Sequence, residues 1–334
     1  MSLDIVVPNL LPPADATERM RSIRLPSLER WLARADIRGD PARGPHEWLA
    51  ATYGLASPAP IAAVALAGEG EAHAGAWMRA DPVHLRVDHD AIILHDASIL
   101  DVRKHEAAAL IEALQRHFNG DGLEFRAPAP DRWYVRARQD GLPATTPLWN
   151  AHGRNVFGLL PEGGGPFNWR SALTEAQMML GAHEVNERRA QEGKPAINSV
   201  WFWGEGTGPP RILKRHGIVH GNDPFARGLA RLTGAEARPQ PRGIADIDLV
   251  PEALGVLAVI DTLAASLHRG DEAAWLAEAQ ALDADWFAKL PEAIARFGEV
   301  RVILPFERGT RVATLDASAR WRVFRPRRPL ATHA

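Results

Sequence analysis

The chain has 334 residues, of which 46% are hydrophobic and 24% are charged, and its formal net charge is −2. These values are typical of a globular protein with a sizeable core, and the length predicts one or two domains. A nearly neutral chain has no general electrostatic attraction for nucleic acid or for an anionic membrane surface, so neither is expected as a partner.

Cysteine is absent, which excludes disulfides, thiolate metal sites and a cysteine nucleophile. The first residues lack the basic and apolar regions of a signal peptide. No apolar run approaches the ~20 residues that a bilayer-spanning helix needs. We therefore expect a cytoplasmic protein.

The first part of the chain predicts short strands and helices. Residues 4–10 indicate a strand that leads into a proline-rich turn. Pro26 and Ser27 then open a helix, with Ser27 as the expected N-cap. Further along, the pattern predicts a loop at 39–45, a short helix or turn at 47–53, and a small apolar segment at 59–68.

A compact group of elements follows. Residues 77–86 and 90–95 predict a hairpin of two strands. Apolar residues at helical spacing predict a helix over 105–118, which ends before Gly120. A turn at 125–130 and a strand at 132–136 complete a group that is compact enough for a small domain.

The remaining chain alternates again between helix and strand. After a loop-rich stretch at 145–165, one long helix is expected over 168–191. Residues 253–267 indicate a buried strand passing into a helix, 275–297 a helical region, and 300–306 a final strand. The basic tail at 325–330 is interpreted as a solvated end, with phosphate binding as the alternative. Strands that alternate with helices predict an α/β protein with a mostly parallel sheet.

The stretch at 195–209 lies at the centre of this plan. Its apolar and aromatic residues favour a buried strand, and the glycines at 204, 206 and 208 indicate that the strand stops at Gly204. In open α/β sheets, a strand followed by a glycine-rich turn places a ligand cleft at the carboxyl ends of the strands. A core strand with a tight exit turn is the alternative.

Six segments carry a resemblance to one family. HEVNERRAQEGK (183–194) is similar to the family's H-P-V-N-x-x-R-x-x-x-G-K, and NSVWFWGEG (198–206) to its N-S-I-W-L-W-G-x-G. Four weaker segments are PSLERWLA (26–33), WMRAD (77–81), EAAALIEAL (106–114) and DRWYV (131–135). The chain thus resembles the archaeal-type cofactor-independent phosphoglycerate mutases of the alkaline-phosphatase-like superfamily, and within them a bacterial branch of RpfE-type regulatory proteins.

The resemblance implies a fold with two parts. The expected core, residues 1–62 and 147–334, is an α/β unit with an alkaline-phosphatase-like, mostly parallel sheet flanked by helices. Residues 63–146 are expected to form a small inserted α+β domain.

The same resemblance implies a site with two divalent metals and a serine that carries phosphate. This sequence departs from that pattern. No acid follows the first strand at 7–9, Pro45 stands where the serine is expected, and Phe306 replaces an aspartate. Only His268 remains of the metal-binding histidines, so we expect no resident metal and no catalytic residue of the family type.

Candidate binding residues come from the same comparison. Arg79 and Arg132 match two arginines that bind the substrate's phosphate and carboxylate in the family, and a guanidinium suits either anion. A structural ion pair is the alternative for each. Asp81 and His84 lie on the same predicted hairpin and are further binding candidates. The alternative for Asp81 is an N-cap or an ion pair with Arg79, and the alternative for His84 is a satisfied core histidine. Asn198 either orients a cleft loop or caps strand backbone.

Two hypotheses follow. The first is a catalytically inactive homologue of phosphoglycerate mutase that acts as a regulatory or ligand-binding protein, whose partner is a small phosphorylated or carboxylate metabolite or another protein. The alternative is an active phosphoglycerate mutase-like enzyme, or another enzyme of phosphate metabolites, with a rearranged site.

Overall fold

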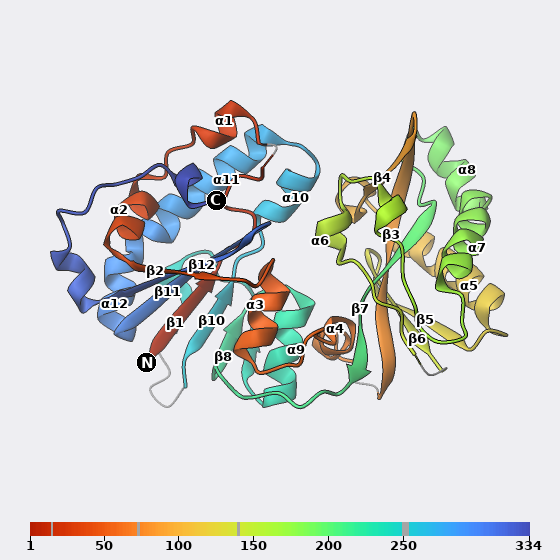
Figure 1. Ribbon diagram of the computed structural model, residues 1–334, viewed down its shortest axis with the longest axis horizontal. Helices are drawn as coiled ribbons and strands as arrows, with labels where there is room; N and C mark the ends of the chain where they lie inside the picture. The colour runs from red at the N-terminus through yellow and green to blue at the C-terminus, as the bar shows by residue number, and fades with distance from the viewer. Residues whose placement is uncertain (15, 72–73, 139–140, 249–253) are drawn as a thin grey trace. The chain divides into compact units, whose positions relative to one another are not determined.

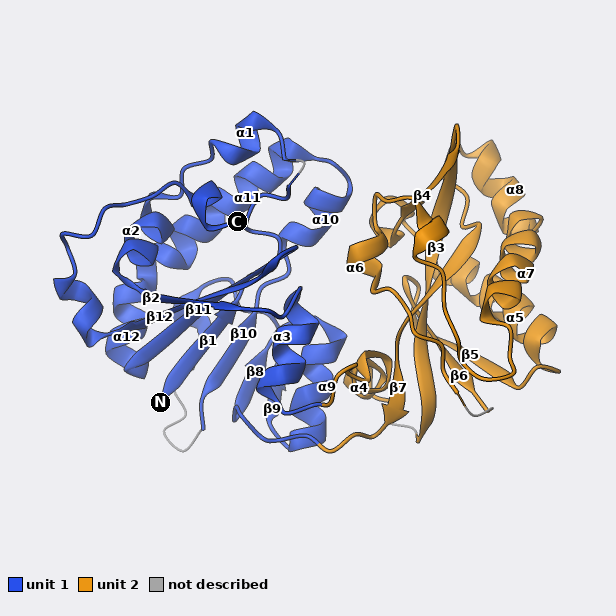
Figure 2. Cartoon of the chain, viewed as in Figure 1, with its two compact units in different colours: residues 1–55, 212–334 blue, residues 56–211 orange. Residues whose placement is uncertain are grey.

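The structure is a computed structural model that describes residues 1–14, 16–71, 74–138, 141–248 and 254–334. The chain divides into two compact units, which Figure 2 colours separately. Unit 1 comprises residues 1–55 and 212–334, and unit 2 comprises residues 56–211. Unit 2 is therefore one continuous piece of chain inserted into unit 1.

Unit 1 is built on a seven-stranded sheet in the order β2-β12-β11-β1-β10-β8-β9 (Figure 1). The strands are β1 (Ser2–Val6), β2 (Asp36–Asp40), β8 (Ile218–His220), β9 (Glu236–Arg238), β10 (Val256–Val259), β11 (Glu299–Phe306) and β12 (Gly309–Asp316). The five strands from β11 to β9 are parallel, and β12 and β2 add an antiparallel edge. The expected mostly parallel sheet flanked by helices is confirmed.

Helices cover both faces of this sheet. They are α1 (Glu18–Arg21), α2 (Pro26–Arg34), α3 (Pro45–Thr52), α9 (Pro224–Thr233), α10 (Leu263–His268), α11 (Glu272–Asp285) and α12 (Leu290–Phe297). Side chains alternate along β1, so Leu3 and Ile5 share one buried core with α2, α11 and α12. Helices α3 and α9 contact each other, and α9 packs on β8 and β9.

The start of α2 differs from the sequence prediction. The helix begins at Pro26, and Ser27 lies inside it rather than at the N-cap. The carboxylate of Asp283, on α11, accepts hydrogen bonds from the backbone N–H groups of Ser27 (3.0 Å) and Leu28 (2.8 Å). An acidic group from a distant helix thus satisfies donors that a local cap would otherwise satisfy.

Unit 2 contains a five-stranded antiparallel sheet in which β4, β3, β6 and β5 follow one another and β7 pairs with β3. The strands are β3 (Gly75–Asp88), β4 (Ala91–His95), β5 (Leu123–Ala129), β6 (Arg132–Ala137) and β7 (Ser199–Gly208). The helices are α4 (Ile61–Gly68), α5 (Lys104–Phe118), α6 (Leu148–Ala151), α7 (Trp169–Gly181) and α8 (Glu184–Gln191). The predicted hairpin, helix and following strand are confirmed, but the turn predicted at 125–130 is wrong, since most of it belongs to β5.

The two faces of the unit 2 sheet have different coverings. Met78, Ala80, Trp133 and Val135 share a core with α5, α7 and α8. By alternation, Arg79, Asp81 and Tyr134 lie on the other face, where α4 packs on β3 and β7. In unit 2, one antiparallel sheet thus lies between helix α4 on one face and helices α5, α7 and α8 on the other.

The stretch at 195–209 does not join the parallel sheet. It forms β7, which pairs antiparallel with β3 and continues past Gly204 to Gly208. A Cβ atom on Gly206 would lie 2.3 Å from Cβ of Pro60, and one on Gly204 would lie 3.1 Å from Cβ of Ile61. The glycines therefore allow the start of α4 to pack directly on the strand, which is the physical reason for the pattern.

This pairing also moves the second boundary between the two parts of the chain. The sequence placed it at 146/147, whereas the compact units divide at 211/212. Residues 147–211 pack in unit 2 because β7 extends the β3 sheet and α7 and α8 cover it.

Two helical regions also differ in detail. The helix expected over 168–191 is divided into α7 and α8, and His183 caps α8 through its Nδ1 atom, 3.2 Å from the backbone N of Val185. The region 275–297 is divided into α11, a 3₁₀ turn at Phe287–Lys289 and α12. Within 253–267 the strand and helix are β10 and α10, and Ala253 lies outside the described residues. Of the loop expected at 39–45, Gly39 and Asp40 belong to β2.

Five other 3₁₀ turns lie at Ala97–Ile99, Val156–Gly158, Ile244–Asp246, Ala317–Trp321 and Leu330–His333. None of the helices described for this chain combines the length and the apolar character that a membrane crossing requires.

Candidate functional site

Arg79 and Asp81 form a buried ion pair on the α4 side of the unit 2 sheet. Nη2 and Nε of Arg79 lie 2.6 and 3.1 Å from Oδ1 of Asp81. The carboxylate also accepts hydrogen bonds from Nε1 of Trp203 (2.7 Å) and the backbone N–H of Trp133 (3.2 Å). The two residues stand two positions apart on one strand, so the pleat places both side chains on the same face.

Aromatic rings enclose this pair. The guanidinium carbon of Arg79 lies 4.8 Å from the ring centroid of Tyr134 and 5.2 Å from that of Trp203. Burial disfavours the charged guanidinium, but the charge and hydrogen bonds of Asp81, together with the influence of Tyr134 and Glu69, outweigh burial and raise the pKa of Arg79. Burial also raises the pKa of Tyr134, whose hydroxyl has no hydrogen-bond partner among the described residues.

Arg132 is the more accessible of the two candidate arginines, with a side chain that is 33% exposed. Its Nε lies 2.5 Å from Oε1 of Glu69, and its Nη1 lies 3.3 Å from Oδ1 of Asp131. Burial opposes the charge, but the hydrogen bonds and charge of Glu69 raise the pKa of Arg132. Each candidate arginine therefore already holds a carboxylate of the protein, and an incoming anion has to displace Glu69 to reach Arg132.

His84 and Asn198 are not part of this group. Alternation along β3 places His84 on the opposite face from Asp81, and its Nδ1 lies 2.9 Å from the carbonyl oxygen of Ala196. Asn198 accepts from the backbone N–H of Leu85 (2.8 Å) and donates to the Leu85 carbonyl (2.9 Å). Its amide thus ties down strand backbone, which is the second of the two roles expected for it.

His95 is the cross-strand neighbour of His84, and their ring centroids are 6.3 Å apart. Burial and the nearby Arg86 and His84 lower the pKa of His95. This histidine was not singled out from the sequence, because the pairing of β3 with β4 is what brings the two rings together.

In unit 1, the carboxyl ends of the parallel strands form the edge at which α/β proteins bind ligands. Asn9 lies beyond β1 with a positive φ of 62°, where the resemblance led us to look for an acid. Pro45 is the first residue of α3, after Gly44 with a φ of 82°. Proline suits this first helical position because its missing N–H has no partner there, but it has no hydroxyl.

Beside Pro45, a histidine and an aspartate meet. Nε2 of His46 lies 2.9 Å from Oδ2 of Asp223, and both side chains are largely buried. Oδ1 of Asp223 also accepts from the backbone N–H of Ala226 (2.8 Å) and caps α9. Sequence reasoning missed Asp223, although an aspartate directly before a proline is a helix-start signal. Glu47, the residue after His46, accepts a hydrogen bond from the backbone N–H of Arg43.

His220 is a second residue that the sequence did not single out. It ends β8 and is 3% exposed. Its Nδ1 lies 3.3 Å from the Pro239 carbonyl, and its Nε2 is buried without a hydrogen-bond partner among the described residues. Burial lowers the pKa of His220, which favours a neutral ring with an acceptor at Nε2.

Three further polar residues of unit 1 belong to different elements of the fold. His268 ends α10, Asp271 caps α11 through the backbone N–H of Ala274 (3.0 Å), and Glu307 is exposed in the turn after β11. Within the described residues of unit 1, taken by itself, no three histidine, aspartate or glutamate side chains converge on one ion position. The donors of this unit do not fit a two-metal centre, which needs several ligands on each ion.

No family model matches the chain. The chain is 28% identical over 186 residues to a probable 2,3-bisphosphoglycerate-independent phosphoglycerate mutase of Geobacter sulfurreducens, which covers 55% of this chain and 42% of that protein. It is 30% identical over 126 residues to the 2,3-bisphosphoglycerate-independent phosphoglycerate mutase of Methanosarcina barkeri. That alignment covers 37% of this chain and 31% of that protein. The chain thus spans less than half the length of these curated relatives.

Solved structures are similar over nearly the whole chain. The PH0037 protein from Pyrococcus horikoshii aligns with 99% of this chain and 92% of its own, with a TM-score of 0.59 and 12% identity. A cofactor-independent phosphoglycerate mutase from Thermoplasma acidophilum aligns with 94% of this chain and 89% of its own, with a TM-score of 0.48 and 16% identity. At 12% identity, the similarity to the PH0037 protein concerns the fold alone. The sequence comparisons support homology to the phosphoglycerate mutases named above.

Proposed function

We propose that this chain is a phosphoglycerate mutase-like protein that does not catalyse the mutase reaction and acts by binding, as a regulatory protein of the RpfE type. Its sequence is similar to enzymes named 2,3-bisphosphoglycerate-independent phosphoglycerate mutases. The inactive part of the proposal rests on this chain's own residues, and the regulatory part rests on its resemblance to the RpfE-type branch.

Pro45 is the observation that carries the proposal. It stands at the first position of α3, where the resemblance leads us to expect the serine that receives phosphate. A covalent phosphoryl intermediate needs a nucleophilic oxygen, and proline has none. Loss of a nucleophile lowers a rate by orders of magnitude, so the shuttle of phosphate through this position is not available.

The donor set of unit 1 supports the same conclusion. Asn9 supplies an amide where the family pattern has an acid, and His46 and Asp223 are hydrogen-bonded to each other. A protein without a resident metal is therefore part of the proposal, and no step of a reaction is assigned to one.

The ligand that we propose is a small phosphorylated or carboxylate metabolite held at Arg132. This guanidinium is partly exposed, whereas Arg79 is buried against Asp81. Binding requires Glu69 to exchange its place with the ligand's anionic group. A protein partner is the remaining possibility for a regulatory function, and the cytoplasm is the expected location.

A mutase assay tests the proposal. The purified protein is incubated with 3-phosphoglycerate and Mn²⁺, and formation of 2-phosphoglycerate is followed with a coupled enolase assay, beside an active mutase as the positive control. We expect no product above the rate without protein, and we expect Pro45→Ser alone to leave the protein inactive because the metal ligands are also missing. Metal-dependent turnover by the wild-type protein would overturn the proposal.

Thermal shift measurements test the binding part. A ligand that binds only the folded state raises the unfolding temperature, by RT ln(1 + [L]/Kd) in free energy. We expect a shift with one of a panel of phosphorylated or carboxylate metabolites, and Arg132→Gln should abolish it, whereas Arg170→Gln on α7 should not. A shift that survives Arg132→Gln would contradict the assignment to Arg132.

A second candidate is an enzyme of a different phosphate metabolite with a rearranged site in unit 1. The observation that favours it is His220, whose buried Nε2 has no partner among the described residues and which ends a parallel strand. Release of inorganic phosphate from a panel of phosphate esters, lost in His220→Gln, would support this candidate over the first.

A further inference from the structure

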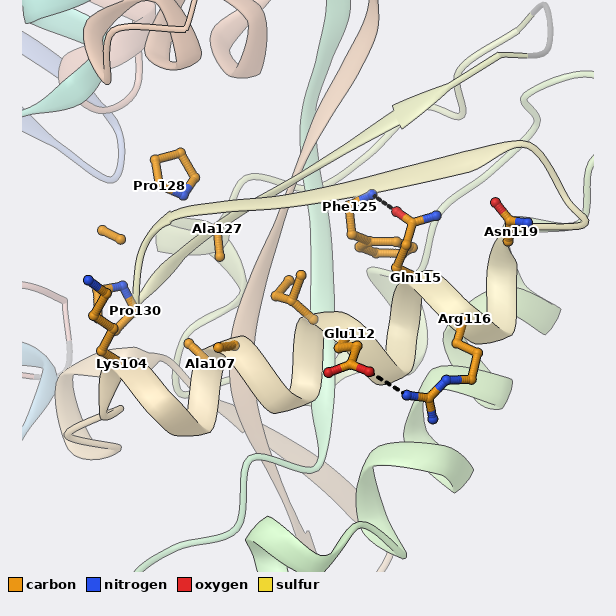
Figure 3. A pocket seen from close by; sticks show the side chains of 13 residues that line it. Lys104, Ala107, Glu112, Gln115, Arg116, Asn119, Phe125, Ala127, Pro128 and Pro130 are labelled. Carbon is orange, nitrogen blue, oxygen red and sulfur yellow. Dashed lines mark hydrogen bonds and ion pairs between the residues drawn. The ribbon is translucent and has the colours of Figure 1, made fainter.

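A groove of about 870 Å³ lies between α5 and β5 in unit 2 (Figure 3). Ala107, Ala108 and Ile111 line it from the helix, and Phe125 and Ala127 line it from the strand. These five side chains are apolar and mostly small, so this part of the lining offers little polar recognition of its own. Specific binding here needs a second kind of contact, which the edge of the sheet supplies.

Strand β5 stands at the end of the strand order in its sheet and pairs with β6. Among the described residues, no strand pairs with its other edge. Such an edge presents backbone N–H and C=O groups to any extended segment that approaches it.

The side chain of Gln115 occupies part of this edge. Its Oε1 accepts from the backbone N–H of Phe125 (2.8 Å), and its Nε2 donates to the carbonyl of Leu123 (3.1 Å). Figure 3 shows Gln115 reaching from α5 to the strand at Phe125. One side-chain amide thus forms a donor and an acceptor bond that the backbone of a neighbouring strand would otherwise form at this position.

We propose that this groove accepts an extended segment of a partner protein, which adds to the sheet as a strand beside β5. The added backbone replaces the amide of Gln115, and every second side chain of the segment packs against Ala107, Ala108 and Ile111. Peptide recognition of this kind combines main-chain hydrogen bonds with shallow contacts for alternate side chains. The small lining residues select apolar side chains of moderate size, such as valine.

The charges along the groove define one end of the segment. Lys104 lines the groove at the first residue of α5, and none of the described residues forms an ion pair with it. A cation at a helix N-terminus adds to the positive end of the helix dipole, so an acidic group is favoured there. Glu112 and Arg116, further along the groove, neutralise each other at 2.6 Å. The segment therefore carries a carboxylate at the Lys104 end, and the groove does not require a charge elsewhere along it.

This proposal is independent of the function proposed above, and two synthetic peptides test it. Each is a fluorescein-labelled nine-residue peptide in which valine alternates with threonine, with two glutamates at the amino end in one peptide and at the carboxyl end in the other. Fluorescence anisotropy measures binding to the full-length protein. We expect one of the two peptides to bind, and its identity gives the direction of the added strand.

Variants then locate the binding. Ala108 is exposed on α5, so Ala108→Arg fills the groove without disturbing the core, and it should weaken binding at least about tenfold, as loss of a central contact does. Met178→Arg on α7 is the matched control, because Met178 is also helical and 72% exposed, and it should leave the affinity unchanged. Gln115→Ala removes the competing amide and should strengthen binding.

Lys104→Glu tests the charge assignment. It should weaken binding of the glutamate-ended peptide and permit binding of a peptide of the same pattern ended by two lysines. Absence of binding by both glutamate-ended peptides, or equal binding by the wild-type protein and Ala108→Arg, would overturn the proposal.

Discussion

Nε2 of His46 lies 2.9 Å from Oδ2 of Asp223, although the two residues are 177 positions apart in the chain. His46 is at the start of α3, and Asp223 caps α9, so their contact joins the two helices that begin at one edge of the parallel sheet. Asp223 has two functions in this arrangement. Its Oδ1 accepts a hydrogen bond from the backbone N–H of Ala226 at the start of α9, and its Oδ2 forms the hydrogen bond with His46.

Substitutions at Asp223 separate these two functions. Asp223→Ala loses the cap and the bond to His46, and we expect it to lower the free energy of unfolding by about 1–3 kcal/mol. Asp223→Asn keeps an acceptor for the backbone N–H of Ala226, so its free energy of unfolding should fall by less than that of Asp223→Ala. Urea unfolding at neutral pH measures both, and equal stability of the two variants would contradict a capping role.

Asp4 should be the strongest electrostatic determinant of stability in unit 1. It is fully buried, and its carboxylate lies 3.0 Å from Nε2 of His216 and within 2.6 Å of the Arg301 guanidinium. Burial alone would raise the pKa of Asp4, but hydrogen bonds and charges from these two partners outweigh it and lower the pKa below the ordinary value. Asp4→Asn breaks a buried charge pair, so we expect it to cost about 3–5 kcal/mol at neutral pH.

The sign of the pH dependence follows from the direction of this shift. Since the folded-state pKa of Asp4 is below the unfolded one, its contribution is complete above the unfolded pKa of about 4 and is lost as pH falls through the folded pKa. Urea titrations between pH 7 and pH 3 should show a loss of stability in acid that is smaller in Asp4→Asn. Asp90→Asn, at an exposed turn, is the control and should follow the wild-type protein. The same acid dependence in Asp4→Asn as in the wild type would refute the assignment.

The buried pair of Arg79 and Asp81 should behave as one unit. Asp81→Ala leaves the Arg79 guanidinium buried between aromatic rings without its carboxylate, and we expect a loss of about 3–5 kcal/mol. The double variant Arg79→Met with Asp81→Ala removes the stranded charge and should be more stable than Asp81→Ala alone. A double-mutant cycle from urea unfolding measures the coupling, and additive effects would show that the pair is not coupled.

Gly206 should tolerate no side chain. A Cβ atom there would lie 2.3 Å from Cβ and 2.5 Å from Cα of Pro60, and backbone cannot move aside as a flexible side chain does. We expect Gly206→Ala to lower stability by about 1–3 kcal/mol, the usual cost of overpacking. Gly120→Ala is the matched control, since no heavy atom lies within 4 Å of its added Cβ. Equal thermal stability of the two variants would disprove the close packing of α4 on β7.

Sequence periodicity was informative wherever an element's partner is near in the chain. The hairpin of β3 and β4 and the helix α5 follow from apolar spacing and turn residues that act over a few positions. The ion pair of Arg79 with Asp81 was also foreseen as one of two roles, because residues two apart on a strand share a face.

Long-range pairing accounts for the features that the sequence did not reveal. Arg132 meets Glu69, and His46 meets Asp223, through contacts across 63 and 177 positions, and neither partner carries a local signal of the other. The same is true of β5, most of which was predicted as a turn, although pairing with β6 makes it a strand at the edge of the sheet.

By itself, the sequence determined that this is an α/β protein with a mostly parallel sheet and that position 45 holds a proline, which has no hydroxyl, because residue type and spacing are properties of the chain alone. Only the tertiary structure decided that the stretch at 195–209 belongs to the antiparallel sheet of unit 2. An apolar strand with glycines suits either sheet equally well, and the choice depends on which distant strand offers its free edge and which helix packs against the glycines.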